Sequence, residues 1–425
     1  MFLKITIPSS TSSIMANQWL SQSPSFTSFR VNKLKEFDTK YLEDYLYKQS
    51  LALNVNTIPK FYFLTPECLI IEQWPIEVSM EKCDNEVIVD VECAAAVLRG
   101  AHVYAPGVMG LPPNCLVNER IDIYGDMEGK CKRGLKVKYE GKKRYVGTGY
   151  LKMLRKDLFE NGVQPSGIAI HIILPESKLA VVNETLCPKG VILLQNLPSI
   201  ICGWVVNAKQ DEYILDMCSA PGNKTTHLAE MSSNKAFITA IDKTPKKVQR
   251  IRENCENHGV TSVKAFVYDS TKCCSKTNIG IYEPPFSPNS FDKVLLDAPC
   301  SGLGQRPRLT NKITPNMLQS YQYLQRKLFY QVKVLKQGGK LVYSTCTINK
   351  DENEGIVSWA LKNIPCLKLV PAEPLLGGPG LPDVGLTDEE RIMVQRFGPE
   401  IDRLRQVEHI YRDGIGFFIA SFTKV

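Results

Sequence analysis

The chain has 425 residues, of which 44% are apolar, and a mean hydropathy of −0.15. This length allows two or three domains, each with its own core. The sequence has no run of about 18 apolar residues, which argues against a transmembrane helix. The 52 Lys and Arg residues exceed the 44 Asp and Glu residues by 8, a surplus that permits a polyanionic partner without requiring one.

The 14 cysteines are scattered along the chain. They form no C-x-x-C pair, and no His/Cys cluster has the spacing of metal ligands. We therefore expect no structural metal and a reducing compartment. The first residues lack the sustained apolar stretch and cleavage site of a secretory signal, so we expect a cytoplasmic protein that is not bound to a membrane.

The first part of the chain divides into two regions. Residues 1–85 mix polar helix-like stretches with short strands, and their role is not legible from the sequence. From Val87 onward, short β-prone runs punctuated by Gly and Pro predict a small β-barrel module over 86–178. Within it, residues 128–145 carry eight Lys and Arg side chains. Charge runs of this kind are more often solvated hairpins than binding sites.

A polar connection over 174–190 leads to a third region, 189–425, in which apolar strands alternate with helical stretches. This alternation predicts a parallel, doubly wound α/β sheet. The predicted strands are 213–217, 237–241, 263–268, 292–297, 340–345 and 414–422. One predicted helix starts at Lys224, and three others cover 246–258, 317–336 and 352–363.

Ligands of such sheets bind beyond the carboxyl ends of the strands. There the first strand runs into CSAPGNKTTH (218–227), a tight turn that opens a helix. Gly222 would allow close backbone approach, and a helix N-terminus favours an anionic group. The segment is neither a G-x-G-x-x-G fingerprint nor a Walker A motif, so a ligand with a small carboxylate is favoured over a phosphate.

Acidic residues follow the next two strands. Asp242 stands where an acid can accept both hydroxyls of a ribose, and Asp269 stands where a carboxylate can accept from an adenine amino group. Each alone could be a turn or cap residue. The ordered series indicates a nucleoside lying across the sheet. S-adenosylmethionine meets both requirements, and the missing glycine fingerprint weighs against its rival, NAD.

Two further strands each end near a cysteine: LLDAPCSGLG (295–304) contains Cys300 and VYSTCT (342–347) contains Cys346. We expect both cysteines to face one pocket at the carboxyl ends of the strands. Methylating a pyrimidine at C5 needs a thiolate that first adds to C6, and a group such as Asp297 that holds N3 as charge develops. Two thiols could share the tasks of attack and release. The competing interpretation is a buried, inert thiol, which we assign to Cys218, Cys255, Cys273 and Cys366.

The segments DMCSAPGNKTTH, AID, YDSTK, LLDAPCSGLGQRP, LQRKLF and VYSTCTINKDENE resemble the motif series of the Nop2/Sun family of RNA cytosine-5 methyltransferases. The resemblance implies a Rossmann-like class I methyltransferase core with S-adenosylmethionine as cofactor. By this resemblance Cys346 is the nucleophile and Cys300 assists release. Asp297 occupies the position of the family's acid, and Lys224 that of its motif lysine. The cofactor positions that it implies are Cys218, Ala220, Pro221, Gly222, Lys224, Asp242, Asp269 and Asp297.

The middle region is similar to an inserted PUA domain, in particular in VLRGAHVYAPGV, and QNLPSI (195–200) leads into the core as in the family member that carries this insertion. The resemblance implies methylation of cytosine 72 at the 3′ acceptor end of tRNAs for cysteine and threonine, with the PUA domain gripping the CCA end. Region 1–85, expected to be α+β, would flank the RNA site. The implied RNA contacts are Arg99, Tyr104, Lys132, Arg133 and Arg155, so the basic segment becomes a binding element, with stacking supplied by Tyr104.

One departure from the family pattern bears on the cofactor. Asn223 stands where the second glycine of A-P-G-G-K-T is usual, and Asn tolerates positive φ better than most residues. Cofactor affinity could be altered by this side chain. Two alternatives stay open: a non-catalytic RNA-binding protein with a methyltransferase-like fold, against which the intact Cys346, Cys300 and Asp297 argue, and a small-molecule enzyme with a reactive cysteine.

Overall fold

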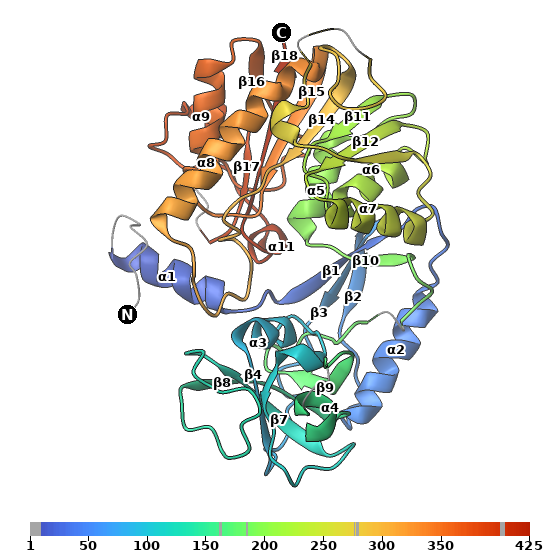
Figure 1. Cartoon of the computed structure of the whole chain (residues 1–425), viewed down its shortest axis with the longest axis vertical. Coiled ribbons are helices and arrows are strands. Elements are labelled where there is room, and N and C mark those ends of the chain that lie inside the picture. Colours follow the sequence, from blue (N-terminus) through green and yellow to red (C-terminus); the bar gives the residue numbers. More distant parts are fainter. Residues whose placement is uncertain (1–9, 161–163, 184–185, 276, 278–279, 400–403) are drawn as a thin grey trace.

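The computed structural model describes residues 10–160, 164–183, 186–275, 277, 280–399 and 404–425. Figure 1 shows a large α/β body with a smaller β-rich module below it and the N-terminal strands between the two. No helix in these described ranges is long and apolar enough to cross a membrane.

The large body is built on an eight-stranded sheet with the order β13-β12-β11-β14-β15-β18-β16, and β17 pairs with β18. The first five strands of that order are parallel, whereas β18 runs antiparallel to β15, β16 and β17. Strand order reverses between β11 and β14, which creates a topological switch point. The strands are β11 (Tyr213–Asp216), β12 (Phe237–Asp242), β13 (Val263–Val267), β14 (Phe291–Asp297), β15 (Leu335–Thr345), β16 (Leu367–Val370), β17 (Gln395–Phe397) and β18 (Phe417–Lys424).

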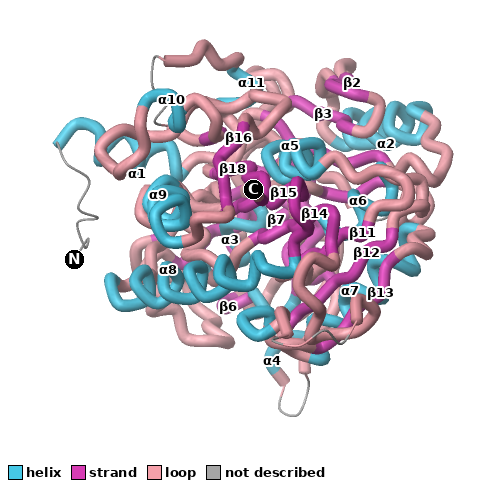
Figure 2. The backbone as a smooth tube through the Cα atoms, turned by 90° about the horizontal axis from the view of Figure 1, so that it is seen from above, coloured by secondary structure: helices cyan, strands magenta, loops and turns pink. Residues whose placement is uncertain are grey.

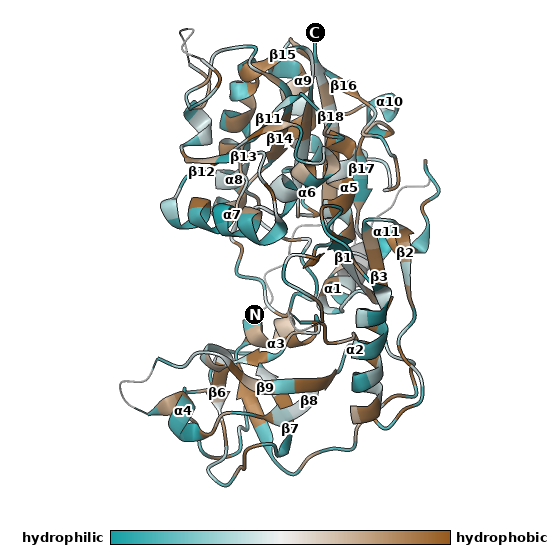
Figure 3. Cartoon of the chain, turned by 90° about the vertical axis from the view of Figure 1, so that its right-hand side faces the viewer, coloured by the Kyte–Doolittle hydropathy of each residue, from teal (hydrophilic) through white to brown (hydrophobic). Residues whose placement is uncertain are grey.

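Helices cover both faces of this sheet, as the view in Figure 2 shows. One face is covered by α5 (Leu197–Val206), α6 (Asn223–Met231) and α7 (Pro245–His258), and the other by α8 (Pro315–Phe329) and α9 (Glu354–Asn363). Consecutive strand residues alternate between the two cores, with Leu295 in one and Leu296 in the other. In Figure 3 the apolar residues concentrate on the sheet and the polar ones on outer surfaces such as that of α7. The predicted doubly wound α/β architecture is therefore confirmed.

One predicted helix is too long. The helix expected over 317–336 ends at Phe329, a 3₁₀ turn covers Tyr330–Val334, and β15 begins at Leu335. The reason is tertiary: Leu335 pairs with Phe291 of β14, which draws the chain into the sheet. Three short segments complete the body, namely the 3₁₀ turn η2 (Ser270–Lys272) and the helices α10 (Asp388–Arg391) and α11 (His409–Arg412).

The smaller module is a six-stranded sheet with the order β5-β9-β8-β7-β4-β6 and a core of its own. Its basic segment is not a regular hairpin: residues 127–142 form the long loop that joins the antiparallel strands β7 and β8. The module's elements are β4 (Glu86–Val89), α3 (Val91–Val97), β5 (Val103–Tyr104), η1 (Ala105–Gly107), β6 (Val108–Gly110), β7 (Arg120–Asp126), β8 (Lys143–Leu151), α4 (Arg155–Phe159) and β9 (Ile168–Pro175).

The N-terminal region forms a third sheet, with the order β10-β1-β3-β2. Because β10 directly precedes the large body and pairs with β1, the six-stranded module is inserted in the chain between two strands of one sheet. The elements are α1 (Ser10–Ser21), β1 (Phe26–Val31), α2 (Thr39–Ala52), β2 (Phe61–Thr65), β3 (Cys68–Glu72) and β10 (Ile192–Leu194).

Candidate active site

The two candidate cysteines lie together at the carboxyl ends of neighbouring strands. Cys300 is in the loop after β14, and Cys346 follows the last residue of β15. Because the strands are parallel and Asp297 lies opposite Ser344, both loops leave the sheet at the same edge. The two Sγ atoms are 3.4 Å apart. The adjacency expected from the sequence is therefore found.

The contact between the sulfurs shifts the pKa values of the two thiols in opposite directions. The hydrogen bond from Cys300 lowers the pKa of Cys346 to about 7, although burial alone would raise it. The same hydrogen bond, together with burial, raises the pKa of Cys300 well above its ordinary value. Since the thiolate is the nucleophilic form, Cys346 is the better nucleophile of the pair at neutral pH.

Asp297 and Lys224 form an ion pair beside the cysteines. Lys224 Nζ lies 2.8 Å from Asp297 Oδ2, and Ser344 Oγ donates to Asp297 Oδ1 at 2.7 Å. Burial alone would lower the pKa of Lys224, but the attraction of Asp297 outweighs it and the pKa is raised. Lys224 is thus a fixed cation, and both carboxylate oxygens of Asp297 are held in place at the end of β14.

The turn between β11 and α6 has the properties expected of a cofactor loop. Gly222 has φ +107° and caps α6 without a side-chain hydrogen bond to the first turn, so N–H groups remain available for an anion. Beneath the turn, Asp216 is buried and its Oδ2 accepts from Thr225 at 2.7 Å. Its Oδ1 has no hydrogen-bond partner among the described residues, and burial raises the Asp216 pKa to about 7. A free, buried carboxylate oxygen beside free N–H groups fits the ammonium and carboxylate of an amino acid.

The other predicted cofactor positions surround this turn. Asp242 is the last residue of β12, and its Oδ2 accepts from the N–H of Ala220 at 3.2 Å. Cys218 and Pro221 lie in the same turn, and Pro221 accepts from Asn254 of α7 at 2.7 Å. Asp269 caps η2 by accepting from Thr271, which is the cap role weighed against cofactor binding.

The tolerance of Asn for positive φ is not used at position 223. Gly222 takes the left-handed conformation, whereas Asn223 is the first residue of α6. A helical backbone accepts Asn without strain. Relative to the usual glycine, Asn223 therefore adds a side chain at the first residue of α6.

The five predicted RNA contacts fall into two groups. Tyr104 is 55% exposed, Lys132 is exposed, and Arg133 donates to the carbonyl of Pro106 at 2.9 Å, which brings the basic loop against the segment after Tyr104. Arg99 is exposed just after α3. Arg155 differs because its guanidinium donates to three backbone carbonyls, those of Leu111, Gly134 and Leu135. It organises the basic loop with most of its donors already used.

Two buried residues near the site were not predicted to matter. Arg30 of β1 donates to Gln195, Thr226, Glu230 and the carbonyl of Asn223, and so joins the N-terminal sheet to the helix that carries Lys224. Glu352 accepts hydrogen bonds from the loops of both cysteines. Glu352 lies in the segment VYSTCTINKDENE, which the resemblance to the family had singled out. Arg30 is a single Arg in an apolar strand, and no pattern in the sequence distinguishes it.

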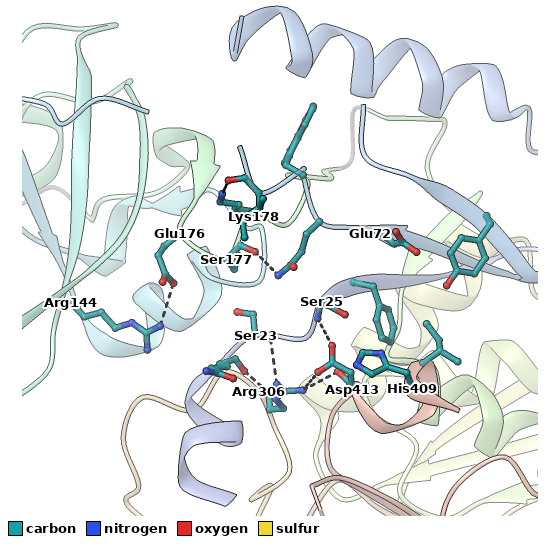
Figure 4. A pocket seen from close by; sticks show the side chains of 17 residues that line it. Ser23, Ser25, Glu72, Arg144, Glu176, Ser177, Lys178, Arg306, His409 and Asp413 are labelled. Carbon is teal, nitrogen blue, oxygen red and sulfur yellow. Dashed lines mark hydrogen bonds and ion pairs between the residues drawn. The ribbon is translucent and has the colours of Figure 1, made fainter. Parts of the chain in front are cut away.

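A large cavity of about 930 Å³ lies elsewhere, where the N-terminal sheet, the six-stranded module and the end of the large body meet (Figure 4). Its charged side chains pair with one another: Arg306 lies 3.0 Å from Asp413 and Arg144 lies 3.3 Å from Glu176. The cavity is lined by neither of the two candidate cysteines nor by Asp297.

A switch-point sheet with an antiparallel strand between β15 and β16, and a cofactor turn after β11, defines the class I methyltransferases. Residues 204–393 match the family model of the 16S rRNA methyltransferases RsmB/F. The tRNA (cytosine(72)-C(5))-methyltransferase NSUN6 of Mus musculus is 41% identical, over 95% of this chain and 88% of that protein. The chain therefore belongs to the Nop2/Sun family of RNA cytosine-C5 methyltransferases.

An archaeal relative agrees with this assignment. The tRNA (cytosine(72)-C(5))-methyltransferase of Pyrococcus horikoshii is 34% identical over 80% of this chain and 75% of its own. The crystal structure of NSun6 from Pyrococcus horikoshii with SFG, an analogue of S-adenosylmethionine, covers 98% of this chain and 94% of its own with a TM-score of 0.74 and 29% identity. S-adenosylmethionine is the cofactor of this chain, and the free Asp216 oxygen and the N–H groups at the start of α6 fit its amino-acid end.

Proposed function

We propose that this RNA cytosine-C5 methyltransferase acts on cytosine 72 at the 3′ acceptor end of CCA-ended tRNAs, those for cysteine and threonine. The relatives from mouse, human and Pyrococcus horikoshii carry names that specify this position of tRNA. The observation that carries the chemistry is the pair of cysteine sulfurs 3.4 Å apart. The free state of all 14 cysteines fits a reducing cytoplasm as the place of reaction.

The proposed reaction begins at Cys346. Its thiolate adds to C6 of the cytosine, and the electrons of the C5=C6 bond move to C5, which becomes nucleophilic. Asp297 holds N3 through a hydrogen bond as charge develops on the ring, and the neighbouring Lys224 and Ser344 keep that carboxyl group oriented. S-adenosylmethionine, when bound, would supply the methyl group to C5, and its sulfur would leave with S-adenosylhomocysteine.

Release follows once the methyl group is on C5. The C5 proton leaves to a base, the returning electron pair restores the C5=C6 bond, and the Cys346 sulfur is expelled. We assign assistance in this step to Cys300, whose sulfur touches that of Cys346 and whose raised pKa keeps it a thiol. The two cysteines therefore divide the labour of attack and release.

The six-stranded module is proposed to be a PUA domain, over 86–178, that grips the CCA end for the core over 189–425. Its exposed Tyr104 can stack on a base, and Arg99, Lys132 and Arg133 can meet phosphates. Arg155 is given a supporting role, because it holds the carbonyls of the basic loop. Region 1–85 is proposed to flank the RNA.

The test is methyl transfer from labelled S-adenosylmethionine to a tRNA transcript ending in CCA. A CCA-truncated transcript and the Cys346→Ala variant run alongside it. We expect label on the intact transcript with the wild-type protein only. Transfer by Cys346→Ala would reject the nucleophile assignment, and equal labelling of the truncated transcript would reject the CCA requirement. Binding of cofactor and tRNA without any transfer would favour a non-catalytic RNA-binding protein.

A further inference from the structure

Glu352 lies between the two cysteine loops and is fully buried. Its Oε2 accepts from the N–H of Ser301 at 2.9 Å, and its Oε1 accepts from the hydroxyl of the same residue at 2.5 Å. From the other loop, Asn349 donates to Oε1 at 3.3 Å. Ser301 directly follows Cys300, and Asn349 lies three positions after Cys346. One carboxylate therefore contacts both loops.

Further hydrogen bonds extend these contacts into a network around Glu352, which we call the Glu352 clamp. The Ser301 hydroxyl lies 2.9 Å from the hydroxyl of Thr347, the residue after Cys346. Gln325 of α8 donates both to Glu352 Oε2, at 3.2 Å, and to the carbonyl of Pro299, at 3.0 Å. The residues next to each cysteine are thus held by one network centred on Glu352.

The chemistry of the group explains why an acid occupies this place. All four donors to Glu352 are neutral, so no ion pair with them compensates the cost of burying its charge. A carboxylate accepts on both oxygens, whereas the amide of Gln has only one acceptor oxygen. Its NH₂ group would face a donor of Ser301, Gln325 or Asn349. Only a carboxylate satisfies both loops at once.

We propose that Glu352 is a positioning residue that holds Cys300 and Cys346 at the spacing where their sulfurs touch. This inference rests on the proposed roles of the two cysteines. Its consequence is that loosening the clamp removes the Cys300 hydrogen bond from Cys346. Cys346 then keeps only its other neighbours, the charges of Asp297, Lys224 and Arg308 and the amide of Gln305.

The experiment uses the full-length protein without RNA and follows alkylation of Cys346 by iodoacetamide, by mass spectrometry of its peptide, as a function of pH. In the wild-type protein we expect half-maximal rate near pH 7, because the Cys346 pKa is about 7. In Glu352→Gln the midpoint should move up by about one unit or more, toward the ordinary thiol value of about 8.5. Phenylarsine oxide, which needs two adjacent thiols, should bind more weakly.

The matched control is Asp122→Asn. Asp122 is also buried and accepts from the neutral donors Thr148 Oγ1, at 2.7 Å, and Cys83 N–H, at 3.2 Å, but lies in the six-stranded module. This variant should lose thermal stability with an unchanged alkylation midpoint. If Glu352→Gln does not fold, Ser301→Ala removes only the hydroxyl bonds and should give a smaller shift in the same direction.

Alkylation midpoints and arsenical affinity in Glu352→Gln equal to those of the wild type would overturn the positioning role. Methyltransferase activity distinguishes the positioning role of Glu352 from the proposed roles of the two cysteines. We expect Glu352→Gln to lower kcat at least tenfold with little change in the KM for either substrate. Shifted alkylation together with an active Cys346→Ala variant would support the clamp and reject Cys346 as the nucleophile.

Discussion

The guanidinium of Arg30 lies 2.9 Å from the carboxylate of Glu230, and both side chains are 1% exposed. Arg30 belongs to the N-terminal sheet, whereas Glu230 belongs to α6, the helix that begins at the cofactor turn. Arg30 also donates to the carbonyl of Asn223 and to Thr226 Oγ1. The N-terminal sheet is therefore attached to α6 by a buried ion pair.

Replacing Arg30 with Met should destabilise the protein by about 3–5 kcal/mol, because removing one partner of a buried pair leaves the other charge uncompensated. The double variant Arg30→Met/Glu230→Met should recover most of that loss, and urea unfolding measures both. The control is Lys60→Met, since Lys60 and Glu72 form an exposed pair at 3.9 Å worth less than about 1 kcal/mol. A double variant as unstable as the single one would contradict the ion-pair account.

Cys300→Ala should trap the RNA on the protein. Without the release residue the bond between Cys346 and C6 persists after methyl transfer, so a denaturing gel should show a shifted band containing both protein and RNA. The Cys300→Ala/Cys346→Ala double variant should show none. A single variant that turns over at the wild-type rate without a shifted band would remove Cys300 from the release step.

The raised pKa of Asp216 predicts that cofactor affinity depends on pH. Its pKa of about 7 means that the carboxyl group is mostly protonated below pH 7 and attracts an ammonium poorly. Affinity for S-adenosylmethionine should therefore rise between about pH 6 and 8, and calorimetry at a series of pH values measures it. Asp216→Asn should bind more weakly, with a flatter dependence. Equal wild-type affinity at pH 6 and pH 8 would contradict the role of Asp216.

The same group affects stability without cofactor. The folded-state pKa of about 7 lies above the unfolded value of about 3.9, so the folded protein holds a proton that the unfolded chain has released between these two values. The unfolding free energy contributed by Asp216 should therefore fall as pH rises from about 4 to 7. Denaturant midpoints of the wild type should fall more steeply over this window than those of Asp216→Asn.

Neutralising the basic loop should weaken RNA binding in a salt-dependent way. Lys132→Gln/Arg133→Gln should reduce the slope of log affinity against log salt by about 0.7 for each phosphate that the loop no longer neutralises. The control is Lys209→Gln/Lys235→Gln, which removes the same charge. These two lysines precede β11 and β12 of the eight-stranded sheet, at the edge opposite to the two cysteines. Identical slopes for the two double variants would show that the loop is only a solvated surface.

Much of the large body could be predicted because its signals are local. Leu295 and Leu296 alternate between two cores, as in a strand covered on both faces, and the prediction of adjacent cysteines followed because parallel neighbours end at one edge. The end of α8 could not be predicted in this way. The pairing of Leu335 with Phe291 decides it, and that pairing is absent from any local pattern.

The sequence by itself determined the class of sheet, the turn expected to bind the cofactor and the pair of candidate cysteines, because periodicity and motif spacing act over a few residues. Tertiary structure decided which thiol is the more acidic and what holds the site together. Arg30 and Thr226 are separated by 196 positions, and Ser301 and Glu352 by 51. Buried charges are stable only with partners in place, and the partners of Arg30 and Glu352 come mostly from segments that meet only in the folded chain.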